Sequence, residues 1–216
     1  MNCMRIFRKY SHPLFLVLFI LLMLQVSCTR SPGKVPEDRE DIISQEVRPS
    51  PDFLFPLDRG KERITKKTFW LKISPKNSPV SPEKFSGYHT GVDFEILEWE
   101  ENTDIIIKAI CSGPLLMKKW ATGYGGVVVQ KCERDTEVIT VVYGHLKLAS
   151  IEAAINTELR AGDTLGILGK WYSSETDNER KHLHLSIHKW SVVNIRGYTS
   201  SEWELSQWIN PLEVLK

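Results

Sequence analysis

The 216-residue chain has little of several features that would place it in a special class of protein. It has only four cysteines, two of them in the first 28 residues, which excludes a small domain held together by many disulfides. Its formal net charge is only +1, so the sequence offers no basic footprint for nucleic acid, and no nucleic-acid partner is expected. With 42% hydrophobic and 25% charged residues, the composition is that of a globular domain with a sizeable core.

One long hydrophobic run lies near the N-terminus. Basic residues within 5–9 precede the apolar run 14–26, which suits a secretory signal and is short for a membrane span. Ser27 and Cys28 then resemble the end of a bacterial lipoprotein signal, in which the cysteine is lipidated, although Gln25 stands where such signals usually have leucine. Ordinary signal cleavage nearby and an uncleaved anchor are the alternatives. In each case we expect the remainder of the chain to be exported.

The exported part divides into two regions. Residues 29–51 are rich in Pro, Ser, Arg, Glu and Asp and have almost no apolar periodicity, which is typical of a flexible, solvated tether. Residues 52–216 are expected to form one folded domain, beginning near Phe53.

Short β-type runs dominate this domain, separated by Gly, Pro, Asn and Asp. They lie at residues 68–73, 92–96, 105–109, 115–120, 127–130, 138–143, 164–168 and 182–188. The pattern predicts an all-β, mainly antiparallel fold. The best candidates for helices are two short segments, at 150–155 and 201–208.

Cys111 and Cys132 are the two cysteines of this domain, and each lies in a β-type run. The turn sequence GYGG at 123–126 lies between them, and a hairpin folded there would place the two cysteines side by side. In an oxidising compartment they could form a disulfide, and two independently buried thiols are the alternative.

Four of the six histidines fall into three short clusters. These are HTGVD at 89–93, YGHL at 143–146 and HLH at 182–184. Because zinc commonly takes imidazole and carboxylate ligands, three from the protein plus water when it is catalytic, the clusters together predict one metal site.

Strand geometry supports this prediction. Side chains two apart in a strand share a face, so His182 and His184 can line one pocket while Leu183 enters the core. His89 and Asp93 also keep this parity, and we expect the intervening Gly91 to let the backbone fold tightly around an ion.

Some of these residues also have a simpler interpretation than metal binding or catalysis. His89 and Asp93 could be a hydrogen-bonded loop pair, and His145 could merely end a strand. His188 shares the parity of His184 but lies further along, and we expect it at the rim or surface, not as a ligand.

Five segments in order carry a family resemblance. They are YHTGVD at 88–93, YGHL at 143–146, AGDTLGILG at 161–169, HLHL at 182–185 and WINPL at 208–212. With these segments the region from about 53 to 215 resembles the lysostaphin-type, or LytM-type, zinc metallopeptidases, which cut peptide bonds in bacterial cell walls. The resemblance implies a fold like the duplicated hybrid motif, with a substrate groove across one sheet and zinc at its floor.

The resemblance also implies roles for individual residues. His89, Asp93 and His184 would be the ligands of one Zn²⁺ per chain, and His145 and His182 would be the catalytic histidines, with the base unassigned. The implied activity is hydrolysis of peptide cross-links in peptidoglycan. The implied location is the bacterial cell envelope, where the chain would be anchored to the membrane through Cys28 or its signal.

The chain departs from the family between Gly169 and His182. The segment 170–181 is longer, more polar and more charged than the compact Gly, Ser and Thr-rich turn of many relatives. In such enzymes this loop walls the substrate groove, so the family's specificity and access to the zinc do not carry over to this chain. A non-catalytic relative that binds the wall or activates other hydrolases is therefore the alternative, although every ligand position is filled. The stretch 162–169 also resembles lipoyl-type and phosphocarrier barrels, but the export signal argues against those cytoplasmic proteins.

Overall fold

The computed structural model describes residues 53–216. The predicted signal, the lipidation site at Cys28 and the predicted tether lie outside the described residues. In the described part, no helix is long and apolar enough to cross a membrane.

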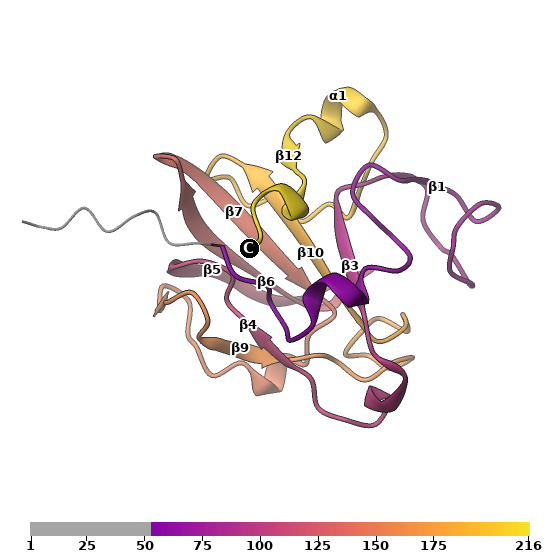
Figure 1. The fold of residues 1–216 in the computed structure, drawn as a ribbon, viewed down its shortest axis with the longest axis horizontal. Helices are drawn as coiled ribbons and strands as arrows, with labels where there is room; N and C mark the ends of the chain where they lie inside the picture. The colour runs from indigo at the N-terminus through magenta and orange to yellow at the C-terminus, as the bar shows by residue number, and fades with distance from the viewer. Residues whose placement is uncertain (1–52) are drawn as a thin grey trace, which may run out of the picture. The chain divides into compact units, whose positions relative to one another are not determined.

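The prediction of an all-β, mainly antiparallel fold is confirmed (Figure 1). The strands are β1 (Lys72–Ile73), β2 (Gly87–His89), β3 (Gly91–Glu95), β4 (Ile106–Lys108), β5 (Gly113–Ala121), β6 (Gly125–Arg134), β7 (Glu137–Gly144), β8 (Glu158–Leu159), β9 (Thr164–Ile167), β10 (His182–Lys189), β11 (Tyr198–Thr199) and β12 (Trp208–Ile209). The helical pieces are η1 (Gly60–Arg63), η2 (Glu98–Glu100), η3 (Leu148–Ser150), η4 (Pro211–Glu213) and the single α-helical turn α1 (Glu202–Leu205).

The main sheet has seven strands, in the order β12-β10-β7-β6-β5-β8, with β3 also paired to β10. The long strands β5, β6 and β7 are neighbours in this sheet, and each runs antiparallel to the next. Two smaller sheets, β4-β9 and β1-β2-β11, complete the described region. In Figure 1 the β4–β9 pair and helix α1 lie on opposite sides of these long strands.

Strand β10 pairs with β3 and with β7, and its side chains alternate between the two faces of the sheet. Leu183, Leu185 and Ile187 are fully buried in the main hydrophobic core, as the alternation in the sequence predicts. The residues between them face the other side, where a smaller cluster includes Tyr124 and Trp208. The histidine face is therefore covered by apolar side chains at one end of β10.

The two helix predictions are only partly right. Residues 151–155 form no helix, because Ile151 is buried and its carbonyl oxygen, with that of Ala153, accepts a hydrogen bond from Lys118 Nζ at 2.9 and 3.1 Å. The second helix is limited to Glu202–Leu205, and Trp208, expected at its end, belongs to strand β12.

Gly91 does not wrap the backbone around an ion. It lies within β3 opposite Ser186, and an added Cβ would lie 2.3 Å from the Leu185 carbonyl oxygen. The lack of a side chain at Gly91 therefore allows β3 to approach β10 closely, and this approach brings the two histidine clusters together.

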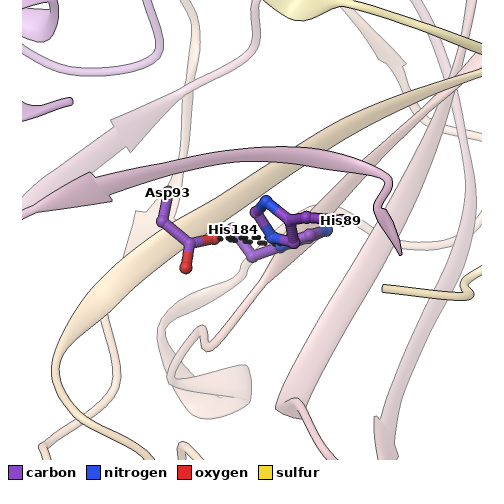
Figure 2. A group of neighbouring side chains, drawn as sticks. All are labelled: His89, Asp93 and His184. Atoms are coloured by element: carbon purple, nitrogen blue, oxygen red, sulfur yellow. Dashed lines mark hydrogen bonds and ion pairs between the residues drawn. The ribbon is translucent and has the colours of Figure 1, made fainter. Parts of the chain in front are cut away.

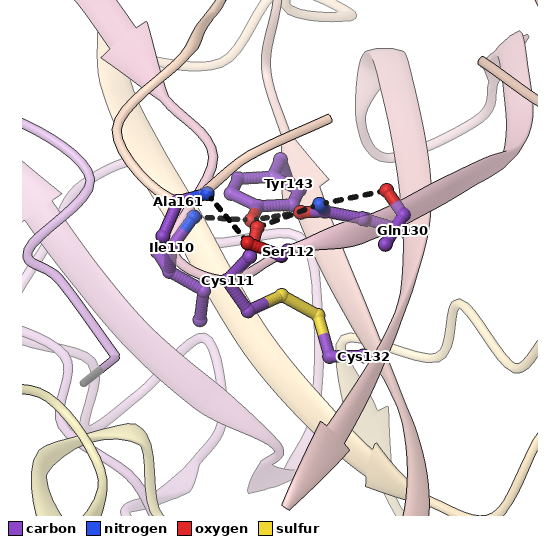
Figure 3. Close-up of a disulfide and its surroundings, with 8 residues drawn as sticks. Ile110, Cys111, Ser112, Gln130, Cys132, Tyr143 and Ala161 are labelled. Atoms are coloured by element: carbon purple, nitrogen blue, oxygen red, sulfur yellow. Dashed lines mark hydrogen bonds between the residues drawn. A yellow bond between two sulfur atoms is a disulfide. The ribbon is translucent and has the colours of Figure 1, made fainter. Parts of the chain in front are cut away.

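Cys111 and Cys132 form a disulfide beside the β5–β6 hairpin (Figure 3). Their Cα atoms lie 6.1 Å apart, within the usual range for a bridge. A buried hydrogen-bond network adjoins them. Tyr143 Oη accepts from the Ile110 amide at 2.9 Å and donates to Gln130 Oε1 at 2.8 Å, while Gln130 Nε2 donates to the Cys111 carbonyl oxygen at 2.9 Å. Of the two alternatives for these cysteines, the disulfide is the one observed.

Removing this disulfide should destabilise the fold substantially. The two cysteines are 21 residues apart in sequence, and closing a loop of that length contributes about 3 kcal/mol to the free energy of unfolding. A Cys111→Ala/Cys132→Ala variant should therefore unfold at a clearly lower urea concentration than the unreduced parent. A reducing agent should lower the midpoint of the parent and leave that of the variant unchanged. Equal midpoints for the unreduced parent and the variant would contradict this prediction.

Candidate metal centre

Three buried side chains converge from three strands (Figure 2). His89 ends β2, Asp93 lies in β3, and His184 lies in β10 directly opposite Asp93 in the antiparallel register. His89 Nε2 lies 3.0 Å from His184 Nδ1, His184 Nδ1 lies 3.1 Å from Asp93 Oδ1, and Asp93 Oδ1 lies 3.2 Å from His89 Nε2. The three atoms form a nearly equilateral triangle.

This triangle has the dimensions that a small tetrahedral ion requires. Zinc bonds of about 2.0–2.1 Å place neighbouring ligand atoms roughly 3.3 Å apart, close to the sides of the triangle. Imidazole nitrogen and carboxylate oxygen are also donors that zinc prefers. His89, Asp93 and His184 could therefore hold a metal ion.

Hydrogen bonding orients the first of these histidines. His89 Nδ1 lies 3.1 Å from the Thr68 carbonyl oxygen, which can only accept, so Nδ1 carries the proton. The lone pair of Nε2 then faces the triangle, as in metal sites where a carbonyl holds the outer nitrogen of a ligand histidine.

The protonation states also suit a metal site. Burial lowers the pKa of His184 to about 4, so its ring is neutral at neutral pH. Burial by itself would raise the pKa of Asp93, but the neighbouring His182, His89 and Arg180 side chains hold it well below the usual range. His184 and Asp93 are thus free of the protons that a metal ion would have to displace.

The two remaining predicted site residues lie beside the triangle. Strand β7 ends at Gly144 opposite His184, so His145 follows next to His182, and their ring centroids are 4.2 Å apart. His182 Nδ1 donates to the Arg180 carbonyl oxygen at 2.9 Å, which leaves Nε2, 3.4 Å from Asp93 Oδ2, as the ring nitrogen that can accept a proton. Burial and then the nearby His182 lower the pKa of His145 well below its ordinary value, so this ring is neutral at neutral pH.

A cleft of about 320 Å³ opens over these side chains. Asp93, His145, His182 and His184 line it together with aromatic and basic residues. Tyr124 is one of the aromatic residues, and its ring centroid lies 5.5 Å from that of His145 and 5.4 Å from that of His184. Burial, then the charge of Asp93, raises the pKa of Tyr124, so its hydroxyl remains a hydrogen-bond donor.

Two charged residues that were not predicted from the sequence contact the site. Arg180 Nη2 donates to Asp93 Oδ2 at 2.7 Å and to Glu95 Oε1 at 2.6 Å. The same parity rule that joins His182 to His184 extends to Arg180, and it also joins Glu95 to Asp93. That rule could have included both residues among the candidates.

The segment 170–181 is held against the β5–β6 hairpin by hydrogen bonds. The Gly126 amide donates to the Glu175 carbonyl oxygen at 2.9 Å, and the Gly123 amide donates to Asp177 Oδ2 at 2.7 Å. Trp120 Nε1 also donates to the Ser174 carbonyl oxygen at 2.9 Å. The segment thereby brings Glu179 and Arg180 to the wall of the cleft.

The expectation that His188 lies at the rim or surface is wrong. Its ring is 4% exposed and packs against Trp208, with a centroid distance of 4.8 Å. It lies four residues beyond His184 on β10 and is not among the three converging donors. Strand β12 pairs with this end of β10, which explains why His188 is covered.

Comparison with known proteins identifies the family. The chain belongs to peptidase family M23, whose model matches residues 87–197. The matched range begins with β2 and includes all five predicted site residues. A search of curated proteins finds no match.

Several solved structures resemble the chain. A chain of the SpoIIQ-SpoIIIAH pore-forming complex is 18% identical with a TM-score of 0.50, and the match covers 76% of this chain and 91% of that one. The catalytic domain of the antimicrobial peptidase lysostaphin from Staphylococcus simulans is 20% identical with a TM-score of 0.47, covering 70% of this chain and 92% of that one. Csd3 from Helicobacter pylori is 20% identical with a TM-score of 0.48, and the match covers 77% of this chain and only 35% of the Csd3 chain.

Proposed function

We propose that this chain is a zinc-dependent endopeptidase that hydrolyses peptide cross-links in bacterial peptidoglycan. Membership of a peptidase family supports the reaction class. The observation that carries the proposal is the triangle of His89 Nε2, Asp93 Oδ1 and His184 Nδ1, with two further histidines beside it in an open cleft.

The chemistry needs contributions from both a metal and the chain. A zinc ion held by the triangle would polarise a carbonyl as a Lewis acid and lower the pKa of a bound water towards ~7. His182 Nε2, which lies 3.4 Å from Asp93 Oδ2, would accept the proton of the attacking water, since the Nδ1 proton is held by the Arg180 carbonyl oxygen. The neutral ring of His145 can donate a hydrogen bond to the developing oxyanion.

We also propose that the chain is exported to the cell envelope and anchored to the membrane through lipidated Cys28. The basic residues, hydrophobic run and Ser27-Cys28 pair at the N-terminus support this location. The Cys111–Cys132 disulfide supports it independently, because structural disulfides persist mainly in oxidising compartments.

Metal removal tests the proposed activity. The purified full chain should contain about one zinc per molecule and should release cross-link peptides from peptidoglycan, which mass spectrometry would identify. A chelator should abolish this release, and added zinc should restore it. Bound zinc without any released peptide would favour the alternative, a non-catalytic relative that binds the wall or activates other hydrolases. A chain that binds no zinc would contradict the site.

A further inference from the structure

The two carboxylate oxygens of Asp93 point to different partners. Oδ1 belongs to the donor triangle, 3.1 Å from His184 Nδ1 and 3.2 Å from His89 Nε2. Oδ2 accepts a hydrogen bond from Arg180 Nη2 at 2.7 Å and lies at the longer distance of 3.4 Å from His182 Nε2. One oxygen is thus available to a metal ion, and the other is occupied by a guanidinium group.

Arg180 is itself held in place by Glu95. Nη2 donates to Glu95 Oε1 at 2.6 Å, and Nε donates to Oε1 and Oε2 at 3.0 and 3.1 Å, so two nitrogens of the fork contact one carboxylate. Glu95 follows Asp93 by two residues in β3, so the two carboxylates lie side by side on one face. The Arg180 and Glu95 side chains are only 13% and 9% exposed, which favours a well-defined geometry.

A cationic side chain beside a cation site needs a reason, because like charges repel strongly at short range in a partly buried place. Glu95 offsets the charge of Arg180, so the pair as a whole is neutral. What remains is a directed N–H group aimed at Asp93 Oδ2. The carbonyl oxygen of the same Arg180 also fixes the proton of His182 Nδ1.

We propose that Arg180 is a positioning residue that leaves Asp93 only Oδ1 to offer a metal ion, so that the carboxylate ligates through one oxygen. This inference rests on the proposed metal site. It also gives a role to the segment 170–181, because this segment supplies the guanidinium that divides the two oxygens. Without Arg180, Oδ2 would keep only the longer 3.4 Å contact with His182 Nε2, so both oxygens could ligate and the coordination number would rise.

Cobalt(II) is a suitable probe, because a four-coordinate Co²⁺ ion absorbs visible light much more strongly than one with more ligands. The full chain, freed of metal and titrated with Co²⁺ alone, should show the strong bands of a four-coordinate ion. An Arg180→Gln variant should still bind Co²⁺ but lose the strong bands. Arg196→Gln is the matched control, because it removes the same charge from the same cleft without touching Asp93, and it should keep the parent spectrum.

Several results would overturn the inference. An R180Q spectrum like that of the parent would show that Arg180 does not divide the oxygens, and failure of R180Q alone to bind Co²⁺ would make Arg180 necessary for assembling the site. If circular dichroism shows that R180Q is unfolded, R180K replaces it, because lysine keeps the charge but cannot contact Glu95 and Asp93 as a fork. R180K should also lose the strong bands, and a parent-like R180K spectrum would contradict the role of the fork. If the parent itself binds no Co²⁺, the proposed metal site fails and this inference fails with it.

Discussion

A His184→Ala variant is expected to lose its bound metal and to hydrolyse peptidoglycan at least about 10³-fold more slowly than the parent, because Lewis-acid catalysis contributes several kcal/mol. The substitution removes one corner of a triangle whose sides are 3.0–3.2 Å. The two remaining donors, His89 and Asp93, cannot supply the three protein ligands that a catalytic zinc site needs. The loss should therefore appear in metal content as well as in rate.

His188→Asn is the matched control for this experiment. His188 lies on the same strand as His184 and is also buried, but it packs against Trp208 and is not one of the converging donors. Elemental analysis should find parent-like zinc in the control and almost none in His184→Ala, and released peptides should follow the same order. Parent-like zinc in His184→Ala would contradict the assignment of this ligand.

A His182→Gln variant is expected to keep its metal and to turn over about 10²–10⁴-fold more slowly, which is the usual contribution of a general acid–base group. His182 Nδ1 is committed to the Arg180 carbonyl oxygen, so Nε2 is the nitrogen that can take a proton. A glutamine amide can occupy the same space and donate a hydrogen bond, but it cannot accept a proton at neutral pH. The defect should therefore lie in turnover and not in metal binding.

A His145→Gln variant shows which of the two histidines is the base and which donates to the oxyanion. If His182 is the base and His145 donates to the oxyanion, a glutamine at His145 can still donate, so His145→Gln should retain more activity than His182→Gln. Zinc content measured on both variants separates a catalytic defect from loss of the metal. An unchanged rate in His182→Gln would exclude His182 as the base, and a larger loss in His145→Gln would exchange the two roles.

The histidine clusters could be predicted because they lie within single short segments. The alternation in HLHLSIH at 182–188 places histidines on one face and leucines on the other whatever the surroundings, and the leucines are indeed in the core. The hairpin around the GYGG turn also depends on residues close together in sequence, and the Cys111–Cys132 disulfide lies beside it. Each of these features depends on residues that are near one another in sequence.

The features that were missed or mistaken depend on contacts between distant residues. Strands β8, β11 and β12 have only two residues each, too few to show any periodicity. The helix expected at 150–155 is absent because Lys118, from β5, satisfies carbonyl oxygens there. His188 is buried because Trp208 arrives from the end of the chain.

The fold class and the candidate ligands could be predicted from the sequence, because strand parity and the order of the motifs are properties of short segments. The meeting of His89, Asp93 and His184 is a property of the folded chain, since it depends on the pairing of β3 with β10 and on the close approach that Gly91 allows. The same pairing places Arg180 beside Glu95 and Asp93 across 85 and 87 residues of sequence. Charges so far apart in the chain interact only after the strands have set their register, which is why the sequence did not reveal their contact.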